Sequence, residues 1–213
     1  MPKLYIHRAA CSLSPHIVVR ELGLDVQIEP VDRVTHQAAD GENFLGINPN
    51  GCVPVLVLDD GEVLMEGPAI VQHLAAMKPE GGLLATDEKR RRRVQSLLNF
   101  IATEIHQPMA QMFYPEYAPV KDALRSHVSK RLDWLSGQFA GDFLTGDALG
   151  LADIYLFVCL NWSLWLDIDL ARWPRFETLM REVGARPAVR EALAAEGLAH
   201  QPNGIHFTPQ AAA

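Results

Sequence analysis

Residues 4–22 read LYIHRAACSLSPHIVVREL, and the change of hydrophobic pattern within this stretch decides the fold. The apolar run 4–6 predicts a strand, and the amphipathic run 17–22 predicts a helix. Cys11 lies at the turn between them, where free N–H groups and the helix dipole stabilise a thiolate and lower a thiol pKa. A buried and inert cysteine is the alternative, because free cysteine is among the most buried residue types.

The position three residues after Cys11 is a serine, Ser14. A C-x-x-C pair closes its own disulfide, whereas a C-x-x-S site forms only a mixed disulfide with an outside thiol or holds a thiol-bearing ligand. The pattern therefore points to the chemistry of a small thiol.

Composition excludes several classes of protein. The chain has 213 residues, of which 48% are hydrophobic and 21% charged, as in an ordinary globular protein. A net charge of −7 argues against nucleic acid as a main partner. The three cysteines form neither a disulfide framework nor a zinc pattern, which suits a reducing cytoplasm. No signal peptide is apparent, and the longest apolar run, 151–165, is shorter than the roughly 20 residues of a membrane span.

The first part of the chain mixes strands and helices in the order β-α-β, irregular segment, β-β-α. The hydrophobic pattern predicts strands over 3–7, 26–31, 53–58 and 63–65, and helices over 15–22 and 69–77. Residues 59–61, Asp-Asp-Gly, are a hairpin signal between the last two strands. We therefore expect an α/β domain over residues 1–78.

Helical patterns dominate after a Pro/Gly-rich linker at 79–86. Thr86 is the predicted N-cap of a long amphipathic helix that continues to about residue 105. Further helices are predicted over 120–139, 152–165, 176–183 and 188–198. The sequence thus predicts an all-helical domain over 87–200, followed by a flexible tail over 201–213.

A basic run, Lys89 to Arg93, is the one feature that suggests nucleic-acid binding. Five consecutive helical residues point all round the helix and form no single stripe. We therefore interpret the run as solvated or as pairing with acidic groups of another subunit.

Two short motifs follow in the α/β part. Val53-Pro54 opens a strand after a Gly-containing loop, which makes it a candidate cis peptide bond whose outward-turned backbone pairs with an extended peptide ligand. An ordinary trans proline at an edge strand is the alternative. Glu66, at the start of the helix over 69–77, either helps to cap that helix or binds a ligand that carries an amine and a carboxylate.

The ordered set of motifs resembles a known family. A strand, then CSLSPHI, a second strand, NPNGCVP, a DDG hairpin, EGPAIV and an all-helical part are together similar to the cytosolic glutathione transferases, over residues 3 to about 198. Cys11 in place of a tyrosine or serine, and NFIATEIH at 99–106, resemble the bacterial beta class. The resemblance implies a thioredoxin-like N-terminal domain, an all-α C-terminal domain, glutathione as cosubstrate, a homodimer and a role in detoxification.

The resemblance also implies roles for individual residues. It assigns the glutathione sulfur to the catalytic residues Cys11, Ser12 and His106. The implied glutathione-binding residues are Val53, Pro54, Glu66, Gly67, Asn99, Glu104 and His36. The implied pocket for an apolar electrophile is lined by Ala10, Met109, Met112, Phe113, Tyr114 and Trp162. No metal is implied.

The chain departs from the beta-class pattern at two charged positions. His36 stands where relatives have a lysine near the glycyl carboxylate, and Gln107 replaces a lysine after the active-site histidine. Gly150 replaces the usual serine or threonine in a helix-capping motif, where Asp153 is expected to be structural.

Three functional hypotheses remain open at this point. The leading one is a glutathione transferase that directs the glutathione thiolate to small apolar electrophiles. The second is glutathione-dependent thiol–disulfide exchange through Cys11. The third is a non-catalytic protein that binds apolar ligands.

Overall fold

The computed structural model describes residues 1–85 and 87–209, so the predicted N-cap Thr86 lies outside the described residues. The chain divides into two compact units. The first contains Met1–Leu84, Arg186–Ala199 and the described residues from Thr208 onward. The second contains Ala85–Ala185 and His200–Phe207.

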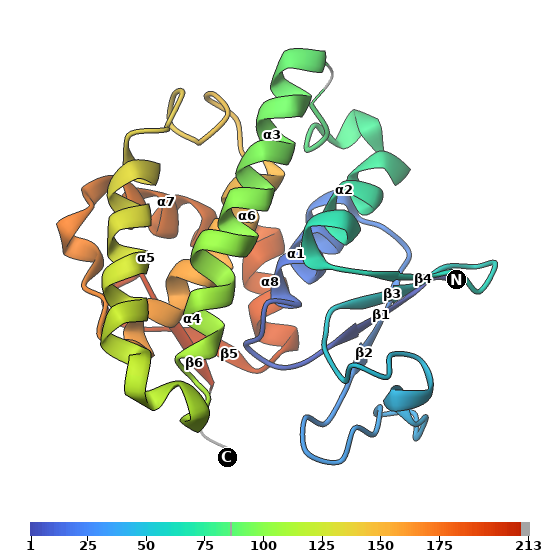
Figure 1. Ribbon diagram of the computed structural model, residues 1–213. Helices are drawn as coiled ribbons and strands as arrows, with labels where there is room; N and C mark the ends of the chain where they lie inside the picture. The colour runs from blue at the N-terminus through green and yellow to red at the C-terminus, as the bar shows by residue number, and fades with distance from the viewer. Residues whose placement is uncertain (86, 210–213) are drawn as a thin grey trace. The chain divides into compact units, whose positions relative to one another are not determined.

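A four-stranded mixed sheet organises the first unit (Figure 1). Its strands are β1 (Lys3–Ile6), β2 (Gln27–Pro30), β3 (Val55–Val57) and β4 (Val63–Met65), in the spatial order β2-β1-β3-β4. β1 and β2 are parallel, and the other two pairs are antiparallel. The predicted thioredoxin-like fold of this part is confirmed.

The strands bury alternate residues on opposite faces of the sheet. Tyr5 and Val55, which are register partners, pack with Val31, Ala38 and Phe44 of the irregular segment. The partners Leu4 and Leu56 are fully buried on the other face. The helices α1 (Leu13–Leu22) and α2 (Gly67–Met77) contact one another and the strands. The sheet is therefore covered on both sides.

α1 begins two residues earlier than the sequence predicted. Pro15 lies in its first turn, where a missing backbone N–H breaks no helical hydrogen bond. The helix ends at Gly23, whose φ of 58° is left-handed, and the N–H of Leu24 donates to the carbonyl of Val19. Both ends of α1 are thus set by local sequence.

The last long helix, α8 (Pro187–Ala195), belongs to the first unit and packs against α1. Arg186 holds this contact through two hydrogen bonds to the Glu21 carboxylate, of 2.6 and 2.8 Å. This differs from the predicted division of the chain, which assigned residues 87–200 to one helical domain. The difference arises because pattern shows that a segment is helical but not what it packs against.

The second unit is helical, as predicted. Its elements are α3 (Glu88–Phe100), a π-helical turn (Ile101–His106), α4 (Gln107–Gln111), α5 (Lys121–Ser136), α6 (Leu151–Asn161) and α7 (Pro174–Gly184). Short 3-10 segments lie at Pro115–Val120, Trp162–Trp165 and Leu170–Arg172 in this unit, and at Phe44–Gly46 and Pro79–Gly81 in the first unit. Every side chain of α6 is buried, and α6 contacts both α3 and α7. Among the described residues, no helix has the length and apolarity needed to cross a membrane.

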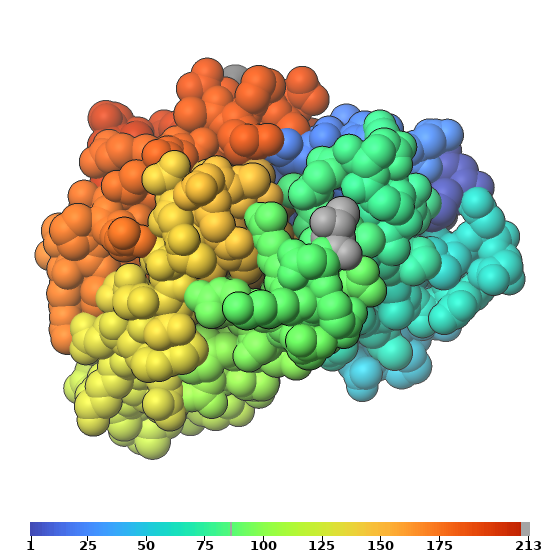
Figure 2. Space-filling model, turned by 90° about the horizontal axis from the view of Figure 1, so that it is seen from above, coloured from blue at the N-terminus to red at the C-terminus, as the bar shows by residue number. Residues whose placement is uncertain are grey.

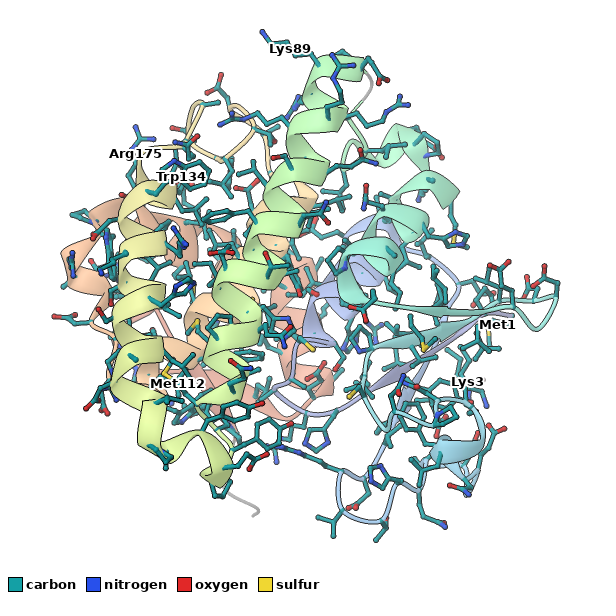
Figure 3. All side chains as sticks on the ribbon, in the orientation of Figure 1. Met1, Lys3, Lys89, Met112, Trp134 and Arg175 are labelled. Atoms are coloured by element: carbon teal, nitrogen blue, oxygen red, sulfur yellow. The ribbon has the colours of Figure 1, made fainter. Side chains whose placement is uncertain are left out.

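The basic run at the start of α3 finds partners within its own chain. Asp87 caps the helix by accepting from the Arg90 N–H at 2.7 Å, and Arg91 and Arg92 pair with Glu88. Arg93 donates to the carbonyls of Leu144 and Gln138, so the start of α3 lies beside the segment after α5 (Figure 2). Lys89 projects from the end of α3 (Figure 3). Pairing across a subunit boundary is therefore not needed to explain Arg91–Arg93.

The described part of the predicted flexible tail, residues 201–209, is structured, and residues 210–213 of that prediction lie outside the described residues. Two short strands, β5 (Leu198–His200) and β6 (Phe207–Pro209), pair with each other. Phe207 is buried, and the Asn161 side chain bonds both its N–H and its carbonyl, at 2.8 and 3.0 Å. The polar composition of residues 200–206 gives no sign of this packing in the sequence, because Asn161 precedes its partner Phe207 by 46 residues.

Candidate active site

Cys11 lies at the turn between β1 and α1, as predicted. Its thiol donates a hydrogen bond to the Val53 carbonyl at 3.3 Å. The Val53–Pro54 peptide bond is cis, so of the two alternatives left open by the sequence the trans proline does not apply. The two motifs, 42 residues apart in the chain, therefore meet at one place in the first unit.

Burial raises the pKa of Cys11 to about 12. The N–H groups of Cys11 and Ser12 lower the pKa by less than burial raises it, and the nearby charges of Cys52 and Glu66 raise it further. The predicted lowering of this pKa by the helix terminus is therefore wrong for the protein without ligand. The sulfur lies deep among protein atoms, although the residue keeps some exposure, and burial outweighs the helix dipole.

This reversal changes the expected order of thiol reactivity. Cys52 is exposed and Cys159 is fully buried, so we expect alkylation of the ligand-free protein at mildly basic pH to label Cys52 first. Peptide mapping by mass spectrometry measures the order, and the unfolded protein, in which all three thiols are open, is the control. Labelling of Cys11 before Cys52 would contradict the assigned burial.

The two serines of the motif are engaged with the backbone. Ser12 is buried, and its hydroxyl donates to the His7 carbonyl at 3.1 Å and accepts from the His7 N–H at 3.0 Å. In this conformation the hydroxyl is not available to donate to a thiolate, contrary to the role implied by the resemblance. Ser14 donates to the Cys11 carbonyl at 2.8 Å. Both hydroxyls fix the turn that carries Cys11.

The loop before Cys11 is anchored from the far end of the chain. Ala9 has a φ of 60°, unusual for a residue with a side chain, and its N–H donates to Glu196 Oε2 at 3.0 Å. The other carboxylate oxygen lies 2.9 Å from Nδ1 of the buried His16. Arg8 donates to the Gly197 carbonyl. The sequence analysis missed these anchors because Glu196 follows Ala9 by 187 residues.

His36 packs against the Gly51 side of the loop that leads to Val53. A Cβ added at Gly51 would lie 3.0 Å from Cε1 of the His36 ring, a tight contact, and the left-handed φ of 66° at Gly51 also favours glycine there. The backbone of His36 is left-handed, with a φ of 55°. Nδ1 is buried without a hydrogen-bond partner among the described residues. The residue as a whole is partly exposed.

Glu66 does not cap α2 with its side chain. It is exposed at the N-terminus of this helix, and its backbone carbonyl accepts from Ala69 and Ile70. Its φ of 72° is strained for a non-glycine residue, and such strain clusters at functional sites. The buried Gly67 follows it in the first turn. The capping alternative for the Glu66 carboxylate is therefore wrong.

His106 ends the π-helical turn of the second unit. Pro108 lacks the N–H that would donate to the Glu104 carbonyl in an α-helix. The N–H of Gln107, the residue before it, donates to the carbonyl of Ala102, five residues back, which is the π-helical pattern. The His106 ring lies 5.2 Å from the Trp162 ring, and its Nδ1 is 2.8 Å from the Tyr155 hydroxyl. Burial lowers the pKa of His106 to about 4, so the ring is neutral at pH 7.

Asn99 and Glu104 are placed differently from one another. Asn99 is exposed on α3. The Glu104 carboxylate pairs with Arg131 Nε at 2.6 Å and with His127 Nε2 at 3.2 Å, both on α5. The implied glutathione contact of Glu104 therefore competes with partners inside its own unit, a feature that the sequence alone did not suggest.

The predicted electrophile pocket separates into exposed and buried residues. Phe113 and Tyr114 are 43% and 44% exposed, and Phe113 contacts the buried Trp162 edge-on at 5.8 Å. Met109 and Met112 are buried; Met112 is labelled in Figure 3. Ala10, in the other unit, is partly exposed. No cluster of three or more potential metal ligands occurs in the described part of the chain.

Comparisons with known proteins agree on one family. The family model "Glutathione S-transferase, N-terminal domain" matches residues 10–77, and "Glutathione S-transferase, C-terminal domain" matches 103–196. The chain is 36% identical to glutathione S-transferase GstA of Escherichia coli O157:H7 over 202 residues, which cover 92% of this chain and 99% of that protein.

Solved structures give the same result. The ternary complex of BphK, a bacterial GST, is 44% identical, with a TM-score of 0.88 over 92% of this chain and all of that one. A sphingomonad glutathione S-transferase complexed with glutathione is 41% identical, with a TM-score of 0.87 and the same coverage. The bacterial beta class enzyme of Sphingomonas chungbukensis is 37% identical, with a TM-score of 0.86 over 92% and 98% of the two chains.

Proposed function

Because this chain belongs to the glutathione S-transferase family, we propose that it conjugates glutathione to small apolar electrophiles, with Cys11 at the glutathione sulfur. The observation that carries the proposal is the 3.3 Å hydrogen bond from the Cys11 thiol to the Val53 carbonyl. It joins the thiol to a backbone segment suited to pair with an extended peptide. Glutathione is such a peptide and carries a thiol of its own.

Three groups of the first unit suit the two ends and the middle of the tripeptide. The Glu66 carboxylate does not cap α2, so it can bind the γ-glutamyl amine beside the N–H of Gly67. His36 offers Nε2 to the glycyl carboxylate. Val53 and Pro54 bind the middle of the peptide through the backbone. Asn99, which is exposed on α3 of the second unit, is a further residue that we propose to contact glutathione.

The protonation state of Cys11 favours conjugation over thiol–disulfide exchange. With a pKa of about 12, Cys11 is a neutral thiol at pH 7, so it donates a hydrogen bond and does not attack as a thiolate. Glutathione supplies the nucleophilic thiolate. When glutathione binds, the single S–H of Cys11 turns from the Val53 carbonyl to the glutathione sulfur and stabilises that anion, and the N–H of the neutral His106 ring does so as well.

The exposed rings of Phe113 and Tyr114 give an apolar surface for the electrophile in the second unit, with the buried Trp162 in contact with Phe113. The buried Met109 and Met112 support this surface from within. Ala10, which is partly exposed in the first unit, is a further residue that we propose for electrophile binding. As the resemblance implies, we propose a homodimer that acts in the cytoplasm.

Parallel assays on Cys11 variants test the proposal. In Cys11→Ala, loss of a hydrogen bond to an anion should reduce kcat/KM for aryl-halide conjugation roughly 10- to 100-fold. Cys11→Ser keeps an O–H donor, so its loss should be smaller. Any reduction of mixed disulfides should vanish in both variants, because no other residue of the motif can carry the bond.

Cys159→Ala, a change of a buried thiol in α6, is the control and should retain conjugation. If the wild-type protein reduces disulfides but conjugates nothing, thiol–disulfide exchange replaces the proposal. If it does neither and still binds an apolar dye, the protein is a non-catalytic binder.

A further inference from the structure

The His106 ring has a defined hydrogen-bond partner in α6. The Tyr155 hydroxyl lies 2.8 Å from His106 Nδ1, and the two rings meet edge to face with centroids 5.7 Å apart. Tyr155 is 2% exposed, and Trp162 packs on the His106 ring at 5.2 Å. The orientation of the imidazole is therefore fixed by two neighbours from α6 and the segment that follows it.

The chemistry of the two groups sets the direction of this bond. A phenol is a stronger acid than the N–H of a neutral imidazole, and an imidazole nitrogen is a better acceptor than a phenolic oxygen. The Tyr155 hydroxyl therefore donates to Nδ1. When one ring nitrogen accepts, the proton of a neutral imidazole is on the other nitrogen, Nε2.

We infer that Tyr155 is a positioning residue, which holds His106 as the Nε2–H tautomer so that the ring presents a donor to the glutathione sulfur. The inference rests on the proposed function, which assigns the glutathione sulfur to His106. It extends that function because it names the residue that decides how His106 acts.

The tautomer matters because the ring is neutral. A doubly protonated imidazole donates from both nitrogens, but burial keeps the pKa of His106 at about 4. In the Nδ1–H tautomer, Nε2 would present a lone pair to an anionic sulfur, which is repulsive. Loss of the Tyr155 hydroxyl removes the preference between the two tautomers and leaves Nδ1 without its donor.

Nitrogen NMR of the ligand-free protein tests the tautomer directly. In the wild type, the His106 Nδ1 resonance should lie in the unprotonated range and Nε2 in the protonated range. In Tyr155→Phe both resonances should move toward averaged values. An Nδ1-protonated ring in the wild type, or an unchanged spectrum in Tyr155→Phe, would overturn the inference.

Conjugation kinetics test the consequence. Tyr155→Phe should lower kcat/KM for glutathione and an aryl halide roughly 3- to 10-fold, as expected for one hydrogen bond. In a His106→Ala background the same substitution should have no further effect, because its target is gone. Tyr5→Phe, which removes the hydroxyl that donates to Glu42 in the first unit, is the matched control and should retain activity.

The outcomes separate this inference from the proposed function. An equal loss on adding Tyr155→Phe to His106→Ala would show a merely structural role for the hydroxyl and would overturn the inference alone. If His106→Ala itself leaves conjugation unchanged, His106 does not act at the sulfur. That result would overturn the inference together with the His106 part of the proposed function, whereas the role of Cys11 would stand.

Discussion

Replacing Asp153 with alanine should lower the free energy of unfolding by about 3–5 kcal/mol, because two buried N–H groups lose their acceptor. The carboxylate is fully buried at the start of α6 and accepts from the Leu144 N–H at 2.8 Å and the Gly150 N–H at 2.9 Å. Gly150 has no side chain with which to cap α6, so nothing local replaces these bonds. Urea unfolding followed by circular dichroism measures the loss.

Asp142→Ala is the matched control, since Asp142 is exposed on the same loop, and it should change stability by less than about 0.5 kcal/mol. Equal effects of the two substitutions would mean that the Asp153 carboxylate does not hold the loop. Asp153→Asn keeps the shape but turns an NH₂ donor toward one of the N–H groups. Its loss should be smaller than that of alanine and still clearly above the control.

The pH dependence of the Asp153→Asn deficit has a defined sign. Burial raises the pKa of Asp153 from 3.8 to about 6, so the folded state binds the proton more tightly than the unfolded state. The part of the stability that comes from binding this proton is complete below pH 3.8 and is lost as the pH rises through 6, whereas the two accepted hydrogen bonds remain. The difference in unfolding free energy between the wild type and Asp153→Asn should therefore shrink between pH 4 and 7. A difference that grows over this range would contradict the assignment.

Replacing Glu196 with alanine should cost about 3–5 kcal/mol, because it leaves the buried His16 and the Ala9 N–H without their partner. His16 and Glu196 are 0% and 1% exposed in their side chains, and Nδ1 lies 2.9 Å from Oε1. The variant should also lose conjugation activity, because Ala9 belongs to the loop that places Cys11. Denaturant unfolding and aryl-halide conjugation measure the two effects.

Glu191→Ala is the control for this position, because Glu191 is exposed on α8 and substitution of it removes charge from the same helix. It should leave both stability and activity nearly unchanged. Glu196→Gln retains an acceptor for the Ala9 N–H and should lose less than alanine. A Glu196→Ala protein as stable as Glu191→Ala would refute the assigned anchoring.

The features that local sequence encodes were predicted well. The turn from β1 to α1 and the candidate cis bond at Val53–Pro54 each depend on a few consecutive residues. The helical character of the second unit follows from the hydrophobic period of α3, α5, α6 and α7. The π-helical turn before His106 was missed, although Pro108 was a visible signal for it.

Features that depend on distant segments were not predictable in the same way. The pKa of Cys11 was expected to fall because the helix terminus is visible in sequence, whereas burial of the sulfur is not. The pairing of Glu104 with Arg131 joins different helices, and so does that of Tyr155 with His106. Nothing in the pattern at 187–195 shows that α8 packs on α1. Tertiary contacts decide all four.

The membership of α8 in the first unit has a consequence for synthesis of the chain. Residues up to Leu84 leave the ribosome well before Arg186–Ala199, which completes their unit, and about a hundred residues of the helical unit emerge in between. At roughly 5–20 residues per second, this delay is on the order of 5–20 s. Until then the nascent N-terminal segment exposes the face of α1 that α8 covers in the finished protein. A chaperone that shields apolar surface on nascent chains has that interval in which to act.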